Sequence, residues 1–307
     1  MNKTPVNSLI NGIASDYLTI NDRSIHYGDG LFETILCNNN KLYYWSQHYQ
    51  RLQASAEQLK IACPPEQVLL DDIAKLLDKN KPGSKSGSKP GSKTGSKLEA
   101  ACAIKIIVSR GAGERGYQFS KNTAASRFIL LSALEADYSS LLSQQLLSGE
   151  LFICKQQVSI NENLAGLKHL NRLENVMARN EWNDKAKNNF IDGLMQNANH
   201  HVIEGIMSNL FAIKNKQLFT PDLKLSGVNG IMREIIIDLA SKNNIKISIV
   251  NLTLDDLTAM DELFISNSLI GMKAVTKLGD SFYKDQAVTN MIFTELLNTR
   301  EAHAQAV

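Results

Sequence analysis

Short apolar runs that are typical of buried strands are interspersed with amphipathic helical patterns along this chain of 307 residues. Strands are predicted at 31–36, 41–45, 100–108, 127–132, 151–158, 245–250 and 262–265, with a turn at 38–40 and an apolar stretch at 204–213. Apolar spacings of three and four predict helices at 48–59, 69–77, 171–182 and 230–240. Because the strands and helices follow no regular alternation, the pattern predicts a mixed α/β (α+β) protein with two domains, 1–118 and 119–307.

One segment has a composition that cannot form a packed core. Residues 81–97 read KPGSKSGSKPGSKTGSK, with five Lys and no acidic or apolar residue. Gly and Ser allow many backbone conformations, and Lys favours solvation, so we expect a flexible insert in a helix-to-strand loop of the first domain. Without its five charges the net charge changes from +2 to −3. The total charge is therefore no argument for nucleic-acid binding.

Other features of the sequence favour a cytoplasmic protein. The N-terminus has no continuous apolar region typical of a signal peptide, and no run of 18 apolar residues could span a membrane. The four cysteines, Cys37, Cys63, Cys102 and Cys154, are scattered, so we expect reduced thiols packed as small apolar groups. No HExxH motif or Cys/His cluster occurs, and no metal site is expected.

Five segments in order resemble one family of enzymes. They are NDRSIHYGDGLFET (21–34), HYQRL (48–52), GLKHLNRLENV (166–176), VIEGIMSNLF (202–211) and GVNGIMRE (227–234). Together they resemble the fold-type IV pyridoxal phosphate enzymes, which include branched-chain aminotransferases, D-amino acid aminotransferases and aminodeoxychorismate lyases. The run KHLNRLE and the segment SRGAGERGY (109–117) are closest to the lyase branch.

The resemblance implies a role for three ionisable residues. Lys168 would be the Schiff-base lysine, and its position after apolar residues favours a free amine. Glu204 would face the pyridine nitrogen and keep it protonated, so that the ring can accept electrons. Arg51 would bind the phosphate, for which a permanently charged guanidinium is well suited.

Further residues follow from the same resemblance. The backbone N–H groups of Ile231 and Met232, at a helix start, would bind the phosphate, with Asn209 and Ser268 nearby. A second group would bind the substrate carboxylates: Tyr27, Arg110 and Arg115. Turn hydrogen bonds remain an alternative for Asn209 and Ser268, as do solvated-loop positions for the two arginines and core packing for Tyr27. Glu33 does not separate the two branches, and His26 and His48 are expected to be structural.

The implied function is the conversion of 4-amino-4-deoxychorismate to 4-aminobenzoate and pyruvate in folate synthesis, with pyridoxal 5′-phosphate as cofactor. A class IV aminotransferase acting on branched-chain or D-amino acids is the alternative, and a binding protein that has lost its site is a third interpretation. The family also implies a homodimer with a small-molecule substrate and a functional link to aminodeoxychorismate synthase. Neither nucleic acid nor a membrane is expected as a partner.

Deleting residues 82–96 tests the interpretation of the insert. Because the segment contains no candidate site residue, we expect cofactor binding and activity to be nearly unchanged. Cofactor titration and steady-state kinetics of the shortened protein would measure this. A large loss of either property would contradict the interpretation.

Overall fold

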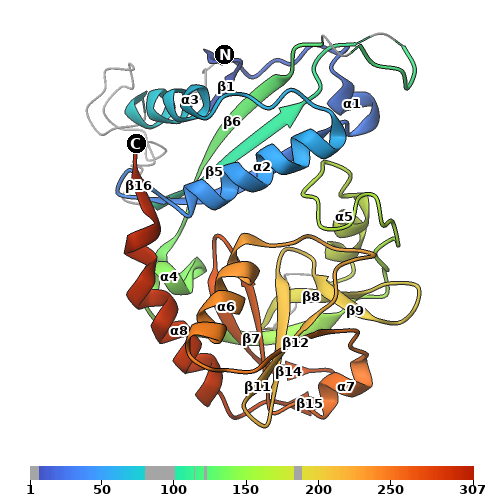
Figure 1. The fold of residues 1–307 in the computed structure, drawn as a ribbon, viewed down its shortest axis with the longest axis vertical. Coiled ribbons are helices and arrows are strands. Elements are labelled where there is room, and N and C mark those ends of the chain that lie inside the picture. The colour runs from blue at the N-terminus through green and yellow to red at the C-terminus, as the bar shows by residue number, and fades with distance from the viewer. Residues whose placement is uncertain (1–6, 80–100, 114, 121–122, 183–188) are drawn as a thin grey trace. The chain divides into compact units, whose positions relative to one another are not determined.

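The computed structural model describes residues 7–79, 101–113, 115–120, 123–182 and 189–307. The chain forms two compact units. The first contains residues 1–136, 169–171 and 303–307, and the second contains residues 137–168 and 172–302. Figure 1 labels many of the elements of both.

A sheet of seven strands forms the centre of the first unit, within its described part. Its strand order is β16-β4-β3-β5-β6-β1-β2. The strands are β1 (Ser8–Ile10), β2 (Ile13–Ala14), β3 (Gly30–Asn38), β4 (Lys41–Tyr43), β5 (Ala101–Ser109), β6 (Ser126–Ala133) and β16 (Ala304–Ala306). All the neighbouring strands are antiparallel. The hairpin between β3 and β4 turns at Asn39 and Asn40, whose positive φ angles suit a tight turn.

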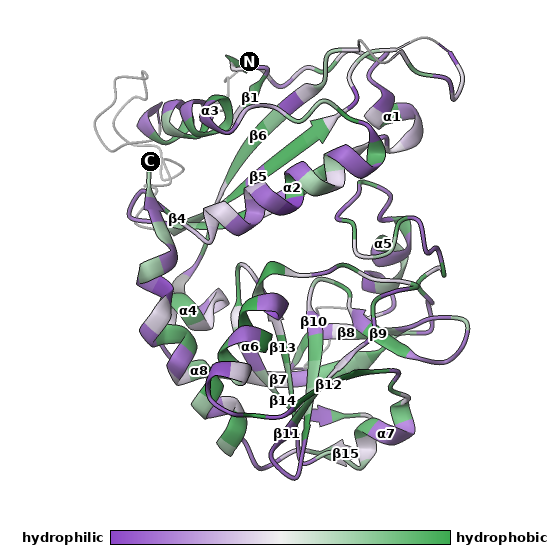
Figure 2. Ribbon diagram, in the orientation of Figure 1, coloured by the Kyte–Doolittle hydropathy of each residue, from purple (hydrophilic) through white to green (hydrophobic). Residues whose placement is uncertain are grey.

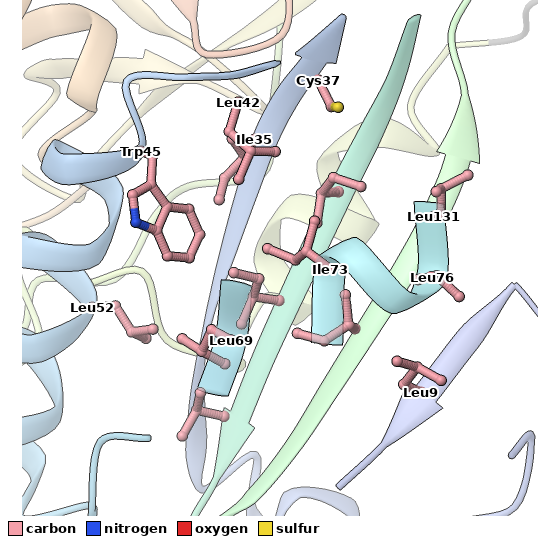
Figure 3. Close-up of a cluster of buried hydrophobic side chains, with 14 of the residues drawn as sticks. Leu9, Ile35, Cys37, Leu42, Trp45, Leu52, Leu69, Ile73, Leu76 and Leu131 are labelled. Atoms are coloured by element: carbon pink, nitrogen blue, oxygen red, sulfur yellow. The ribbon is translucent and has the colours of Figure 1, made fainter. Parts of the chain in front are cut away.

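The core of the first unit lies between this sheet and two helices, α2 (Trp45–Leu59) and α3 (Glu66–Lys79). Figure 3 shows Trp45 and Leu52 of α2 and Leu69 and Ile73 of α3 beside Ile35 of the sheet. Figure 2 shows β5 as largely hydrophobic and α2 as mixed, as expected for a helix with one buried face. A short helix, α1 (Arg23–Tyr27), precedes β3.

The second unit is built on a sheet of nine strands in the described chain, ordered β12-β11-β10-β13-β14-β7-β8-β9, with β15 beside β14. The strands are β7 (Leu147–Ile153), β8 (Phe190–Gln196), β9 (Val202–Gly205), β10 (Asn209–Lys214), β11 (Gln217–Pro221), β12 (Ile247–Val250), β13 (Glu262–Asn267), β14 (Gly271–Leu278) and β15 (Ser281–Phe282). Parallel and antiparallel neighbours are mixed: β7 is parallel to both β14 and β8, whereas β8 and β9 are antiparallel.

The helices of this unit are α4 (Ser140–Ser143), α5 (Leu173–Arg179), α6 (Ile231–Lys242), α7 (Leu254–Thr258) and α8 (Ala287–Thr299) in the described chain. Ala178 of α5 and Leu257 of α7 each belong to a buried hydrophobic cluster of the unit. Short 3₁₀ turns, η1 (Ala136–Tyr138) and η2 (Arg300–His303), complete the elements. Helices α6 and α8 contact each other and β13.

The structure confirms the mixed α/β class and most of the predicted elements. Strand β7 begins four residues before the predicted 151–158, and α5 begins at Leu173, after the candidate lysine. The chain divides after residue 136 rather than after residue 118, because β6 pairs along β5 and therefore belongs to the first sheet. The insert 81–97 lies outside the described residues.

The cysteine and membrane predictions can also be compared with the structure. All four cysteines are free thiols; Cys37, Cys102 and Cys154 are buried and Cys63 is partly buried. Cys37 and Cys102 lie opposite each other on β3 and β5. In the part of the chain that is described, no helix is both long and apolar enough to cross a bilayer.

Candidate active site

Lys168 lies in a segment whose backbone is held by a second loop of the same unit. The Gly166 N–H donates to the Gly227 carbonyl at 2.9 Å, and the Gly166 carbonyl accepts from the Asn229 N–H at 3.0 Å. Leu167 is buried and Lys168 is partly buried. The backbone two residues before the lysine is therefore fixed by hydrogen bonds, which limits where its side chain can reach.

Arg172 connects this segment to the helix that follows it. Its Nη2 atom donates to the Leu167 carbonyl at 2.8 Å, and α5 begins at the next residue, Leu173. The helix predicted after the lysine is therefore present. The guanidinium of Arg172 and the ammonium of Lys168 are both close enough to Glu204 to lower the pKa of its carboxyl group.

Glu204 is a buried carboxyl group near the end of β9, and it is 5% exposed. Its Oε2 atom accepts from the Val228 N–H at 2.9 Å. Burial raises its pKa from 4.5 to about 7, against the lowering effects of the Val228 hydrogen bond, Arg172 and Lys168, and the negative charge of Asp192 adds to the increase. A cation placed beside Glu204 would favour the ionised form.

The start of α6 lies next to the same loop. Asn209, the first residue of β10, donates from Nδ2 to the Val228 carbonyl at 2.9 Å. A Cβ atom at Gly230 would lie 2.0 Å from the Asn209 Oδ1 atom, so a side chain there would displace the Asn209 amide. Gly230 begins α6 without a side-chain cap, and Ile231 and Met232 form the first turn. This helix start has the positive dipole end that suits an anion.

Ser268 follows β13 in a turn of the second unit. The Asn267 Oδ1 atom accepts from the N–H groups of both Leu269 and Ile270 at 2.9 Å, so Asn267 closes a turn around Ser268. Ser268 itself is partly buried. Its predicted role near the phosphate stays a prediction.

The second unit therefore contains groups that suit the functional parts of pyridoxal phosphate. Lys168 provides an amine, and Glu204 provides a buried carboxyl group that a protonated pyridine nitrogen would stabilise as the carboxylate. The uncapped start of α6 can receive a phosphate through backbone N–H groups. The Gly227–Gly230 loop connects all three, through Gly166, Glu204 and Asn209. In chemical type, these residues fit the cofactor.

Arg51 belongs to the first unit and is bound to a buried acid. It donates from Nε to Glu33 Oε1 at 2.9 Å and from Nη2 to Glu33 Oε2 at 2.5 Å. The His48 Nδ1 atom lies 2.6 Å from the same Oε2 atom. Burial acts to raise the pKa of Glu33, but Arg51 and His48 outweigh it and lower that pKa to about 2. Glu33 and His48 thus have a structural role beside Arg51, as was predicted for His48.

Arg110 is held by protein groups within the first unit. Its Nε and Nη2 atoms donate to both carboxylate oxygens of Asp29, at 2.8 and 3.0 Å. Nη1 and Nη2 also donate to the carbonyls of Lys60 and Leu59 at the end of α2, at 2.7 and 2.9 Å. The guanidinium stacks on Phe119 at 3.7 Å. These contacts fix the position of Arg110 within the first unit, and substrate binding by Arg110 stays a prediction.

Tyr27 and Arg115 lie around one loop of the first unit. The Tyr27 hydroxyl oxygen accepts from the Gly116 N–H at 3.1 Å, and its ring lies 5.4 Å from that of Tyr117. Arg23 stacks on the Tyr27 ring at 4.8 Å. Arg115 is exposed. Tyr27 thus supports the loop that contains Arg115, and substrate binding by either residue stays a prediction.

Two residues near Glu204 were not identified from the sequence. Arg172 lies inside the run KHLNRLE, which served only as a marker of the lyase branch. Asp192 is 3% exposed and lies in β8, whose apolar neighbours gave no indication of a functional acid. Groups of His, Cys, Asp and Glu that could hold a metal ion are absent from the described ranges.

Comparisons with known proteins show which family the chain belongs to. The model of the family "Amino-transferase class IV" matches residues 30–278. The chain is 33% identical to an aminodeoxychorismate lyase of Vibrio harveyi over 87% of this chain and 89% of that protein. It is 27% identical to a D-alanine aminotransferase of Listeria monocytogenes, covering 84% and 81% of the two chains.

Among solved structures, the 4-amino-4-deoxychorismate lyase of Pseudomonas aeruginosa matches with a TM-score of 0.78 and 28% identity, over 95% of this chain and 98% of the other. The family match covers most of the chain, and it includes the segments that hold Lys168, Glu204 and the start of α6. The chain belongs to the class IV aminotransferase family, whose enzymes use pyridoxal phosphate.

Proposed function

We propose that this protein is a pyridoxal phosphate-dependent lyase that converts 4-amino-4-deoxychorismate to 4-aminobenzoate and pyruvate. The observation that carries the proposal is the identity of 33% with an aminodeoxychorismate lyase over 87% of the chain. The lyase structure from Pseudomonas aeruginosa, at 28% identity, supports it. The run KHLNRLE, which contains both Lys168 and Arg172, is the local sequence feature that favours the lyase over an aminotransferase.

In this proposal Lys168, Glu204 and the start of α6 each have a defined task. Pyridoxal phosphate, when bound, provides an electron sink for the negative charge that forms on the substrate carbon. The Lys168 Nζ atom takes the proton from the carbon that bears the amino group and then donates a proton to the leaving enolpyruvyl group. Loss of that group as pyruvate makes the ring aromatic. Glu204 holds the pyridine nitrogen protonated, and the start of α6 binds the phosphate.

The roles of Arg51 and the wider biology follow from the resemblance. Arg51 is proposed to bind the phosphate, and the bidentate pair with Glu33 fixes the orientation of its guanidinium. We also infer a cytoplasmic homodimer that acts in folate synthesis and receives its substrate from aminodeoxychorismate synthase.

Replacement of Lys168 by alanine tests the central assignment. Because no other group would take its place as base and Schiff-base amine, K168A should have no turnover and should lack the absorbance band of the lysine-bound cofactor. Spectra and turnover of the purified variant measure both. Lys155, an exposed lysine of the same unit, provides a control, and K155A should keep both properties. A K168A protein that retained them would exclude this assignment.

The pKa of Glu204 predicts how stability depends on pH without cofactor. Its carboxyl has a pKa of about 7 in the folded protein against a normal value of 4.5. The folded state therefore binds the proton more tightly than the unfolded state does. The stability that this proton contributes is lost as pH rises from about 4.5 through about 7. Between pH 5 and 8 the wild-type free energy of unfolding should fall by about 2–3 kcal/mol relative to E204Q. Urea denaturation of both proteins measures this, and parallel pH profiles would contradict it.

A direct assay separates the two reactions of the family. Purified protein incubated with 4-amino-4-deoxychorismate should release 4-aminobenzoate and pyruvate in equal amounts. In parallel, D-alanine or a branched-chain amino acid is offered with 2-oxoglutarate, and little glutamate is expected. Transamination without the aromatic product would instead assign the protein to the aminotransferases.

A further inference from the structure

Asp192 is a buried carboxyl group to which the proposed reaction gives no task. Its Oδ2 atom accepts from the Ser208 hydroxyl at 2.6 Å and from the Met207 N–H at 3.2 Å. Its Oδ1 atom accepts from the Gly193 N–H at 2.8 Å. Burial raises its pKa, against the lowering effect of these donors. A buried acid with several donors is costly to remove, because its partners would be left unsatisfied.

These donors belong mainly to the turn that joins β9 to β10. The turn closes through the Gly205 N–H, which donates to the Ser208 carbonyl at 2.7 Å. A Cβ atom at Gly205 would lie 2.4 Å from the Ser208 Oγ atom and 2.6 Å from the Asp192 Oδ2 atom. The space beside this backbone is therefore filled by the Asp192–Ser208 pair, which only glycine permits.

The same turn separates two residues of the candidate site. Glu204 comes immediately before it and Asn209 immediately after it, and each binds the backbone of Val228. A shift of the turn would therefore move both contacts with the loop that leads into α6. Functional groups need such support because small displacements of a site weaken binding strongly.

Two side-chain amides, one on α5 and one on β13, also hold the turn. Asn175 Nδ2 donates to the Ile206 carbonyl at 2.9 Å, and Asn267 Nδ2 donates to the Met207 carbonyl at 3.0 Å. These amides bind carbonyl groups, whereas Asp192 accepts from the Met207 N–H and the Ser208 hydroxyl. Asp192 thus provides the carboxyl group that accepts hydrogen bonds from the turn.

We propose that Asp192 is a positioning residue of the cofactor site, which holds the Gly205–Ser208 turn so that Glu204 and Asn209 both reach the Val228 backbone. This inference rests on the proposed function for its effect on the cofactor. It also has an electrostatic consequence that needs no cofactor.

That consequence is an effect on the proton affinity of Glu204. Burial and the charge of Asp192 raise the pKa of Glu204, whereas Lys168 and Arg172 lower it. The charge of Arg233 on α6 also interacts with Glu204. Removing the negative charge of Asp192 should therefore lower the pKa of Glu204.

The substitution D192N removes this charge and keeps the size of the side chain. We expect the dissociation constant for pyridoxal 5′-phosphate to rise by roughly tenfold, because the turn loses the carboxylate that accepts its hydrogen bonds. In the cofactor-free protein the titration midpoint of Glu204, followed by carbon-13 NMR of its carboxyl group, should fall.

Glu262 offers a matched control in the same unit. It is 2% exposed and also accepts from two backbone N–H groups and one hydroxyl, of Val288 and Thr289, at 2.6–2.9 Å. E262Q should lower stability but leave the cofactor affinity and the Glu204 midpoint unchanged. If D192N behaved in the same way as E262Q, Asp192 would be only a structural residue and the inference would be wrong.

Two further outcomes keep the test decisive. If D192N does not fold, S208A removes only the hydroxyl that donates to Asp192, and it should raise the dissociation constant a few-fold with the fold intact. An unchanged constant would overturn the inference. A wild-type protein that binds no cofactor would reject the proposed function instead, whereas the Glu204 midpoint in D192N would still test the link between the two acids.

Discussion

The hydrogen bond between the Glu204 carboxyl group and the Val228 N–H is the contact on which the candidate site depends. It attaches β9 to the Gly227–Gly230 loop, which also binds Gly166 before the lysine and continues into α6. Three segments that are distant in the sequence meet at this loop. Burial makes the ionised acid costly, and the lysine and Arg172 offset only part of that cost.

A second buried acid shows how strongly the surroundings decide the protonation state. Glu33 and Glu204 are both almost inaccessible to solvent, at 2% and 5% exposure. Arg51 and His48 bind Glu33 at 2.5–2.9 Å and lower its pKa to about 2, whereas Glu204 receives one backbone hydrogen bond and has a pKa of about 7. Glu33 is therefore a permanent anion that orients an arginine. Glu204 can be protonated by itself and ionised when a cation is bound beside it.

Much of the fold was predictable because the signals were local. The strand at 31–36 and the helix at 48–59 follow from apolar spacing, and the structure extends them only at their ends. The division between the units was less predictable, because the pairing of β6 with β5 is a contact between distant segments. Arg110 shows the same limit: its sequence context gave no sign that Asp29 and the carbonyls at the end of α2 would accept hydrogen bonds from it.

The sequence by itself determined the class of fold and the family, and it indicated the candidate reactive groups, because motif residues and apolar periods are properties of short segments. Only the tertiary structure decided the state and support of those groups. Glu204 has a raised pKa because distant residues bury it, and Asp192 accepts hydrogen bonds from the turn after Glu204 because β8 pairs with β9. Burial and pairing depend on chain segments that meet only in the folded state, so a reading of local sequence could not reveal them.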